Sequence, residues 1–110
     1  MSPSAKPVRG STTGRPIMVL LDLIGQRWTL RILWELQPGP ETFRSLQARC
    51  GGISPTVLNT RLKALREAGL VDAGEEGYRL TEDGRTLGQQ LLALDGWARD
   101  WADRRRTPLA

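Results

Sequence analysis

The stretch from Gly52 to Leu70 (GISPTVLNTRLKALREAGL) limits the possible folds more than any other part of this sequence. It predicts a single helix, because Ser54 can cap the start, Pro55 suits the first helical position and Gly69 follows the end. Its leucines recur at spacings of four and three and would form one apolar stripe. The stripe consists of Leu58, Leu62 and Leu65. One face of this helix should therefore pack on a core while the other stays available for binding.

That other face carries short hydrogen-bonding groups and cations instead of the usual mixture of Glu and Lys. Side chains of these types can reach base edges and phosphates in the major groove of DNA. On a helical wheel the face contains Thr56, Asn59, Thr60 and Lys63, with Arg61 on its flank. A polar solvated face is the alternative interpretation, and this helix alone does not decide between the two.

The distribution of charge favours the nucleic-acid interpretation. The 110-residue chain has a formal net charge of +4, with 16 Lys and Arg against 12 Asp and Glu. Between Thr42 and Arg66 there are five basic residues and no acidic one, whereas the rest of the chain holds 11 basic and 12 acidic residues. The basic residues are Arg44, Arg49, Arg61, Lys63 and Arg66. The positive excess therefore lies on the segment of the candidate helix, which indicates an anionic partner.

Other functions lack the residues that they would need. The chain has no histidine and only one cysteine, Cys50, so it has no internal disulfide and no sign of an oxidising compartment. No catalytic constellation, phosphate loop or metal-ligand spacing is present. We therefore expect a cytoplasmic protein that is not an enzyme and needs no cofactor or metal. Cys50 should be a small buried thiol, with oxidative regulation as the alternative.

The chain before the basic segment divides into a tail and two helices. Residues 1–14 are rich in Ser, Thr, Pro and Gly, which predicts a disordered tail or, alternatively, a basic arm on DNA. A helix from Pro16 to Ile24 is apolar on nearly all sides, so a partner subunit should cover part of it. It is too short to span a membrane. A second helix should run from about Arg27 to Gln37. Its core candidates are Trp28, Leu30, Leu33 and Trp34.

The middle of the chain predicts a helix-turn-helix followed by a wing. Thr42 can cap a short helix from Phe43 to Arg49, and a Gly-Gly turn then leads into the longer helix. Two short segments, Leu70–Ala73 and Tyr78–Leu80, flank a turn at residues 74–77 and predict a β-hairpin. The expected fold is thus mostly α with a small β-hairpin, a winged helix-turn-helix domain over residues 15–106.

A long last helix, from Thr81 to about Arg105, carries an apolar stripe larger than a small core needs. Together with the first helix it predicts a homodimer interface. The residues expected there are Ile17, Leu20, Leu21, Ile24, Leu91, Leu94, Trp97, Ala98 and Trp101. The alternative is that the stripe packs only on its own domain. Trp97 and Trp101, four residues apart, could simply pack together or could form a pocket for a small, flat, apolar effector.

Several side chains can be given roles on DNA. Arg44, and with it Arg49, would contact phosphates, as would the start of the reading helix at Ser54. Thr56, Asn59, Thr60 and Lys63 would approach bases, with Asn59 suited to adenine and Lys63 to guanine. Arg61 could do either, or could be a structural cation paired with Glu67 or another carboxylate.

Three segments resemble the HxlR-type winged helix-turn-helix transcription regulators of bacteria, which are relatives of the MarR group. They are LDLIGQRWTL at residues 21–30, GISPTVLNTRLKALREAGLV at residues 52–71 and YRLTEDGRTL at residues 78–87. The resemblance implies a homodimer, joined through its first and last helices, that binds double-stranded DNA at a near-palindromic operator. We expect a repressor. The alternative is a winged helix for protein contacts, or an effector-sensing dimer with little DNA specificity.

The chain departs from that family at two places. Many members have a cysteine before the proline that starts the first helix, and here the position is Arg15, so thiol sensing by that route is not available. The wing of that family is often longer, with prolines and a cation near its tip, whereas here the tip is Glu75-Glu76. These two carboxylates would repel the phosphates beside a minor groove. On the wing, only Arg79 is placed to contact the DNA backbone.

Overall fold

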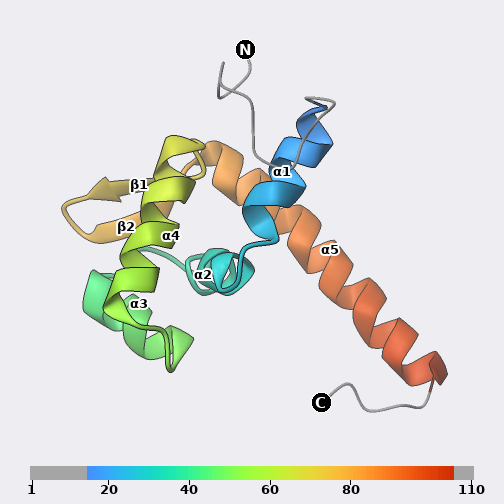
Figure 1. Ribbon diagram of the computed structural model, residues 1–110. Coiled ribbons are helices and arrows are strands. Elements are labelled where there is room, and N and C mark those ends of the chain that lie inside the picture. Colours follow the sequence, from blue (N-terminus) through green and yellow to red (C-terminus); the bar gives the residue numbers. More distant parts are fainter. Residues whose placement is uncertain (1–14, 106–110) are drawn as a thin grey trace.

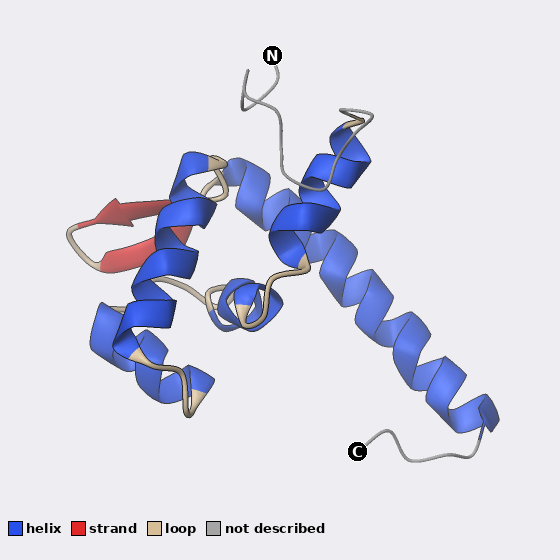
Figure 2. Cartoon of the chain, in the orientation of Figure 1, coloured by secondary structure: helices blue, strands red, loops and turns tan. Residues whose placement is uncertain are grey.

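The computed structural model describes residues 15–105 as a helical chain with one β-hairpin inserted before its last helix (Figures 1 and 2). The elements, in order, are α1 (Pro16–Ile24), α2 (Thr29–Glu35), α3 (Phe43–Cys50), α4 (Pro55–Glu67), β1 (Val71–Gly74), β2 (Gly77–Leu80) and α5 (Glu82–Arg105). This order confirms the predicted winged helix-turn-helix, with α3 and α4 as its helix pair and the hairpin as its wing. The predicted tail, residues 1–14, lies outside the described residues.

The caps predicted for the longer helix of the pair are present. The Ser54 hydroxyl accepts a hydrogen bond from the Val57 N–H at 3.1 Å, and Pro55 is the first helical residue. Gly69, just beyond the end, has φ +76°, a left-handed conformation that glycine adopts at little cost. In α3 the Thr42 hydroxyl accepts from the Ser45 N–H in the same way. Local sequence alone thus sets where both helices begin.

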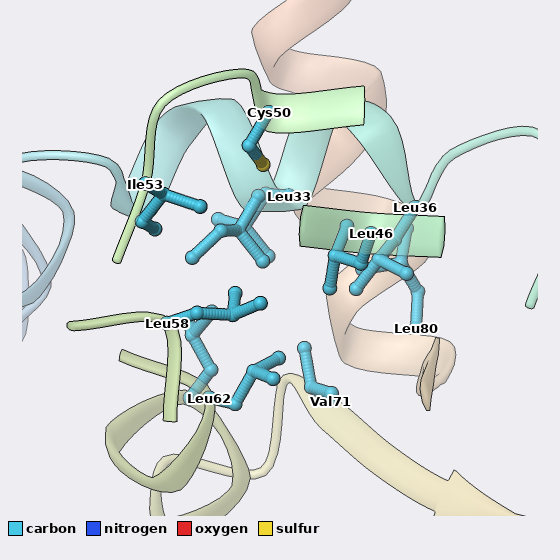
Figure 3. Packing of buried hydrophobic residues seen from close by; sticks show 11 residues of the cluster. Leu33, Leu36, Leu46, Cys50, Ile53, Leu58, Leu62, Val71 and Leu80 are labelled. Atoms are coloured by element: carbon cyan, nitrogen blue, oxygen red, sulfur yellow. The ribbon is translucent and has the colours of Figure 1, made fainter. Parts of the chain in front are cut away.

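The core forms where α2, α3 and α4 meet (Figure 3). The leucine stripe of α4 is fully covered, with Leu58, Leu62 and Leu65 at most 1% exposed. The facing residues are Ile32, Leu33, Leu36, Leu46, Cys50, Ile53, Val71 and Leu80. Burial of one leucine side chain stabilises a fold by about 1.5–3 kcal/mol, so this stripe fixes which face of α4 points outward.

The second helix differs from its prediction. It begins at Thr29, two residues later than expected, because Trp28 adopts a left-handed backbone conformation with φ +79°. Leu30 and Trp34, expected in the core, are instead 41% and 37% exposed. These two residues are four apart and share one face, whereas the buried residues Ile32, Leu33 and Leu36 occupy another face. Trp28 packs only partly against the core.

The first and last helices leave much apolar surface uncovered. No residue of α1 is fully buried, and the C-terminal half of α5 projects away from the rest of the molecule (Figure 1). The exposed fractions reach 55% at Ile17, 47% at Leu21, 58% at Leu94 and 57% at Trp97. No helix in the described part of the chain is long and apolar enough to cross a membrane.

Candidate nucleic-acid interface

The polar face of α4 is open to solvent. Thr56, Asn59, Thr60 and Lys63 are all exposed in the structure, opposite the buried leucine stripe. The Thr60 hydroxyl donates to the Thr56 carbonyl at 2.9 Å, so its oxygen can still accept a hydrogen bond from a partner. The helix therefore presents a solvated row of an amide, two hydroxyls and an ammonium group.

Arg61 lies on the flank of that row and is only half exposed. Its Nε donates a 2.8 Å hydrogen bond to the carbonyl of Arg27, in the turn that connects α1 to α2. The pairing with Glu67 that the sequence left open is not formed, and the partner is a backbone carbonyl instead. The described structure thus gives Arg61 a contact within the protein.

The phosphate-binding candidates on α3 and at the start of α4 differ in their surroundings. Ser54 is exposed at the helix N-terminus, and Arg44 is exposed on α3 without an ion pair among the described residues. Arg49, in contrast, contacts Glu41 at 2.9 Å and Glu35 at 3.8 Å. The Arg49 carbonyl also accepts a hydrogen bond from Arg31 at 2.7 Å. Arg49 therefore closes a network between α2 and α3 and is less available to a ligand than Arg44.

A shallow hollow of about 310 Å³ extends the face of α4 toward β1. It is lined by Lys63, Arg66, Glu67, Val71 and Asp72. The structure thereby adds Arg66, a residue of the acid-free basic segment that the sequence analysis did not include among the site residues. Two signals in the sequence could have found it: Arg66 belongs to the basic segment, and it follows Lys63 by three residues and Asn59 by seven, a spacing that places it beside the polar row.

The wing offers less positive charge. Arg79 is opposite Asp72 in the hairpin register, and the two side chains approach to 3.6 Å. The turn at Glu75 and Glu76 is exposed. A guanidinium beside a carboxylate, with two more carboxylates at the tip, gives the hairpin little attraction for a polyanion.

Cys50 is the buried residue that ends α3. Its side chain is 2% exposed, and burial raises the pKa of the thiol, an effect that Arg31 opposes and Glu35 reinforces. The prediction of a small buried thiol is therefore confirmed. A protonated and covered thiol is a poor nucleophile, which agrees with a structural role.

An exposed polar helix, held as the second member of a helix-turn-helix and followed by a β-hairpin, defines a winged helix-turn-helix protein. Comparison with known proteins narrows this class. A family model described as HxlR-like helix-turn-helix matches residues 23–106. The chain belongs to this family, whose members are DNA-binding transcriptional regulators and not enzymes.

Relatives and solved structures agree with the assignment. An HTH-type transcriptional regulator of Mycobacterium tuberculosis is 38% identical over 106 residues, which cover 90% of this chain and 64% of the relative. The chain thus spans about 64% of the length of its mycobacterial relatives. A possible HxlR family transcriptional factor from Thermoplasma volcanium has a TM-score of 0.69 at 32% identity, covering 82% of this chain and 86% of that chain. Quinone-bound YodB from Bacillus subtilis has a TM-score of 0.72 at 30% identity, and the match covers 76% of this chain and 96% of the YodB chain.

Proposed function

We propose that this chain is a transcriptional repressor that binds double-stranded DNA as a homodimer, at a near-palindromic operator in the cytoplasm. The observation that carries the proposal is the open face of α4. Thr56, Asn59, Thr60 and Lys63 are exposed there, while the leucines behind them are buried. An α-helix fits the major groove, and these side chains have the donors and acceptors that distinguish base pairs.

Docking would combine phosphate contacts with base contacts. Arg44 and the free N–H groups at the start of α4, beside Ser54, would bind phosphates and set the register. Asn59 would then pair with adenine, and Lys63 would contact guanine or a neighbouring phosphate. Arg79 would contribute little to DNA binding, because the Asp72 carboxylate already lies beside its guanidinium.

The proposed homodimer would cover the apolar surfaces of α1 and α5. The residues proposed to lie in the interface are Ile17, Leu20, Leu21, Ile24, Leu91, Leu94, Trp97, Ala98 and Trp101, and none of them is fully buried in the single chain. Exposed apolar surface of this extent is typical of an interaction site. A symmetric dimer would present two copies of α4, which suits two half-sites about 34–36 Å apart.

The salt dependence of binding to duplex DNA tests the central claim. If α4 contacts phosphates, affinity should fall steeply with rising salt, and Lys63→Ala should either reduce the salt slope by about 1 or cost about 1–3 kcal/mol at particular base pairs. Arg99→Ala is the matched control, because it removes the same charge from α5, where Arg99 pairs with Asp95. Equal effects of the two substitutions, or no retention on DNA in dilute salt, would favour a winged helix used for protein contacts.

A small, flat, apolar effector is a second element of the proposal. The rings of Trp97 and Trp101 stack at 5.8 Å and 17°, and the Arg105 guanidinium lies 5.7 Å from the Trp101 ring. YodB, a solved neighbour, has a quinone-bound form. A quinone should therefore quench tryptophan fluorescence in the wild type and much less in Trp97→Ala. Trp34→Phe, which alters an exposed tryptophan on α2, should keep the response.

A further inference from the structure

The turn between α1 and α2 holds an uncommon backbone conformation. Trp28 has φ +79° and ψ −17°, a left-handed region that bulky residues seldom occupy. The Thr29 N–H donates to the Gln26 carbonyl at 3.1 Å, and the Arg27 guanidinium lies 5.5 Å from the Trp28 ring. A conformation of this kind persists only when its surroundings hold it in place.

Arg61 is one of the groups that hold it. The 2.8 Å bond from its Nε to the Arg27 carbonyl joins residues 34 positions apart and ties the middle of α4 to this turn. The turn follows α1 directly, and α1 exposes an apolar face at Ile17 and Leu21. The bond therefore lies between the helix proposed to read DNA and the helix proposed to contact a second subunit.

We propose that Arg61 is a positioning residue for DNA binding: it holds α4 at a fixed angle to α1, so that the two reading helices of the dimer meet successive major grooves. The inference rests on the proposed function and adds a residue to it. A guanidinium suits this role because it is always charged and directs its N–H groups in a rigid plane. Asn59 and Lys63, which are exposed on the same helix, keep the role of contacting DNA.

Binding to a series of operators separates positioning from contact. Half-site spacing is varied by one and two base pairs, and the salt slope is measured for each variant. Arg61→Ala should weaken binding at the preferred spacing by about tenfold, reduce the preference for that spacing and leave the salt slope unchanged. Lys63→Ala should leave the spacing preference intact, whether it changes the slope or the base preference.

Arg61→Lys distinguishes geometry from charge. It keeps the cation but loses the planar Nε donor, so it should resemble Arg61→Ala if Arg61 positions the helix. If Arg61→Lys binds DNA like the wild type, Arg61 contacts phosphate and the inference is wrong. The same conclusion follows if Arg61→Ala lowers the salt slope by about 1 and keeps the spacing preference. Unchanged affinity, slope and spacing preference in both variants would also overturn it.

Amide hydrogen exchange supplies a measurement without DNA. The Thr29 N–H bonds to Gln26 and the Ile32 N–H bonds to Trp28 at 2.9 Å, so both amides report on the turn. They should exchange faster in Arg61→Ala and Arg61→Lys than in the wild type, and at the wild-type rate in Lys63→Ala. Unchanged exchange in the Arg61 variants would show that Arg61 does not hold the turn. If the wild-type protein does not bind DNA, the proposed function is wrong. The exchange rates of the two amides would still test whether Arg61 holds the turn.

Discussion

Glu41 and Tyr78 exchange a pair of backbone hydrogen bonds, from the Glu41 N–H to the Tyr78 carbonyl at 2.9 Å and from the Tyr78 N–H to the Glu41 carbonyl at 2.8 Å. This antiparallel bridge attaches the segment before α3 to strand β2 of the wing. The wing is therefore anchored at both of its sides, through β1 to the end of α4 and through Glu41 to the start of α3. A short two-stranded hairpin is marginal alone, so this bridge contributes to its stability.

The bridge leads to the first prediction, that Gly77→Ala destabilises the protein. Gly77 has φ +112°, and a Cβ there would lie 2.4 Å from the Glu41 carbonyl oxygen. Strain of this kind costs about 1–3 kcal/mol, and we expect a loss of about 2 kcal/mol in the free energy of unfolding. Urea denaturation measures the loss.

Gly74→Ala is the control at the other end of the same turn. Its φ is not positive, and an added Cβ would meet the Arg79 guanidinium at 3.4 Å, a side chain that can move. Its unfolding free energy should stay within about 0.5 kcal/mol of the wild type. Equal losses of unfolding free energy in the two variants would mean that the close approach of Glu41 does not disfavour a side chain at position 77.

The helix-turn-helix was predictable because its signals are local. Ser54, Pro55 and Gly69 mark the ends of α4 within a few residues, and a leucine stripe defines its buried face whatever it packs against. The exposed polar row of the candidate site follows from the same periodicity. This part of the fold therefore needed no knowledge of distant contacts.

The contacts that the sequence did not predict join residues far apart in the chain. Nothing near Arg61 indicates that its partner is the carbonyl of Arg27, and nothing near Glu41 indicates a bridge to Tyr78. The exposure of Trp34 was missed for a related reason. Size and hydrophobicity favour burial of a tryptophan, but the face of α2 that packs is chosen by Ile32, Leu33 and Leu36.

The second prediction contrasts the two arginines of α3. Arg44→Ala should weaken DNA binding and reduce the salt slope by about 1, since Arg44 has no ion pair among the described residues. Arg49→Ala should leave the slope nearly unchanged, because Arg49 already pairs with Glu41 and Glu35. Titrations of duplex DNA at several salt concentrations measure both. An equal drop in slope for Arg49→Ala would show that DNA displaces those carboxylates.

The third prediction concerns the proposed homodimer. Leu94 is 58% exposed on α5, and Leu94→Glu would place a charge in the proposed interface twice, once from each subunit. The dimer dissociation constant should rise by about a hundredfold or more. Light scattering during size-exclusion chromatography measures the mass. Gln89→Glu adds the same charge to an exposed position on another face of α5 and should leave the dimer intact. A monomeric wild type would refute the homodimer.

The fourth prediction follows from the burial of Cys50, which raises the pKa of its thiol in the folded state. The folded protein therefore keeps its proton at a pH where the unfolded chain, with a cysteine pKa of about 8.5, has begun to lose it. Proton release from the unfolded chain favours unfolding, so the contribution of Cys50 to stability is complete below about pH 8.5 and is lost as pH rises through the folded pKa. The loss is at most about 1.4 kcal/mol for each pH unit.

Urea denaturation of the wild type and Cys50→Ala at about pH 7.5, 8.5 and 9.5 measures this contribution. At the lowest pH the wild type should be the more stable, since alanine leaves a small cavity among Leu33, Leu46 and Ile53. The advantage of the wild type should then shrink as pH rises, because only the wild type carries the thiol, while other titrating groups are shared. A constant difference across this range would show that Cys50 titrates alike in the folded and unfolded chains.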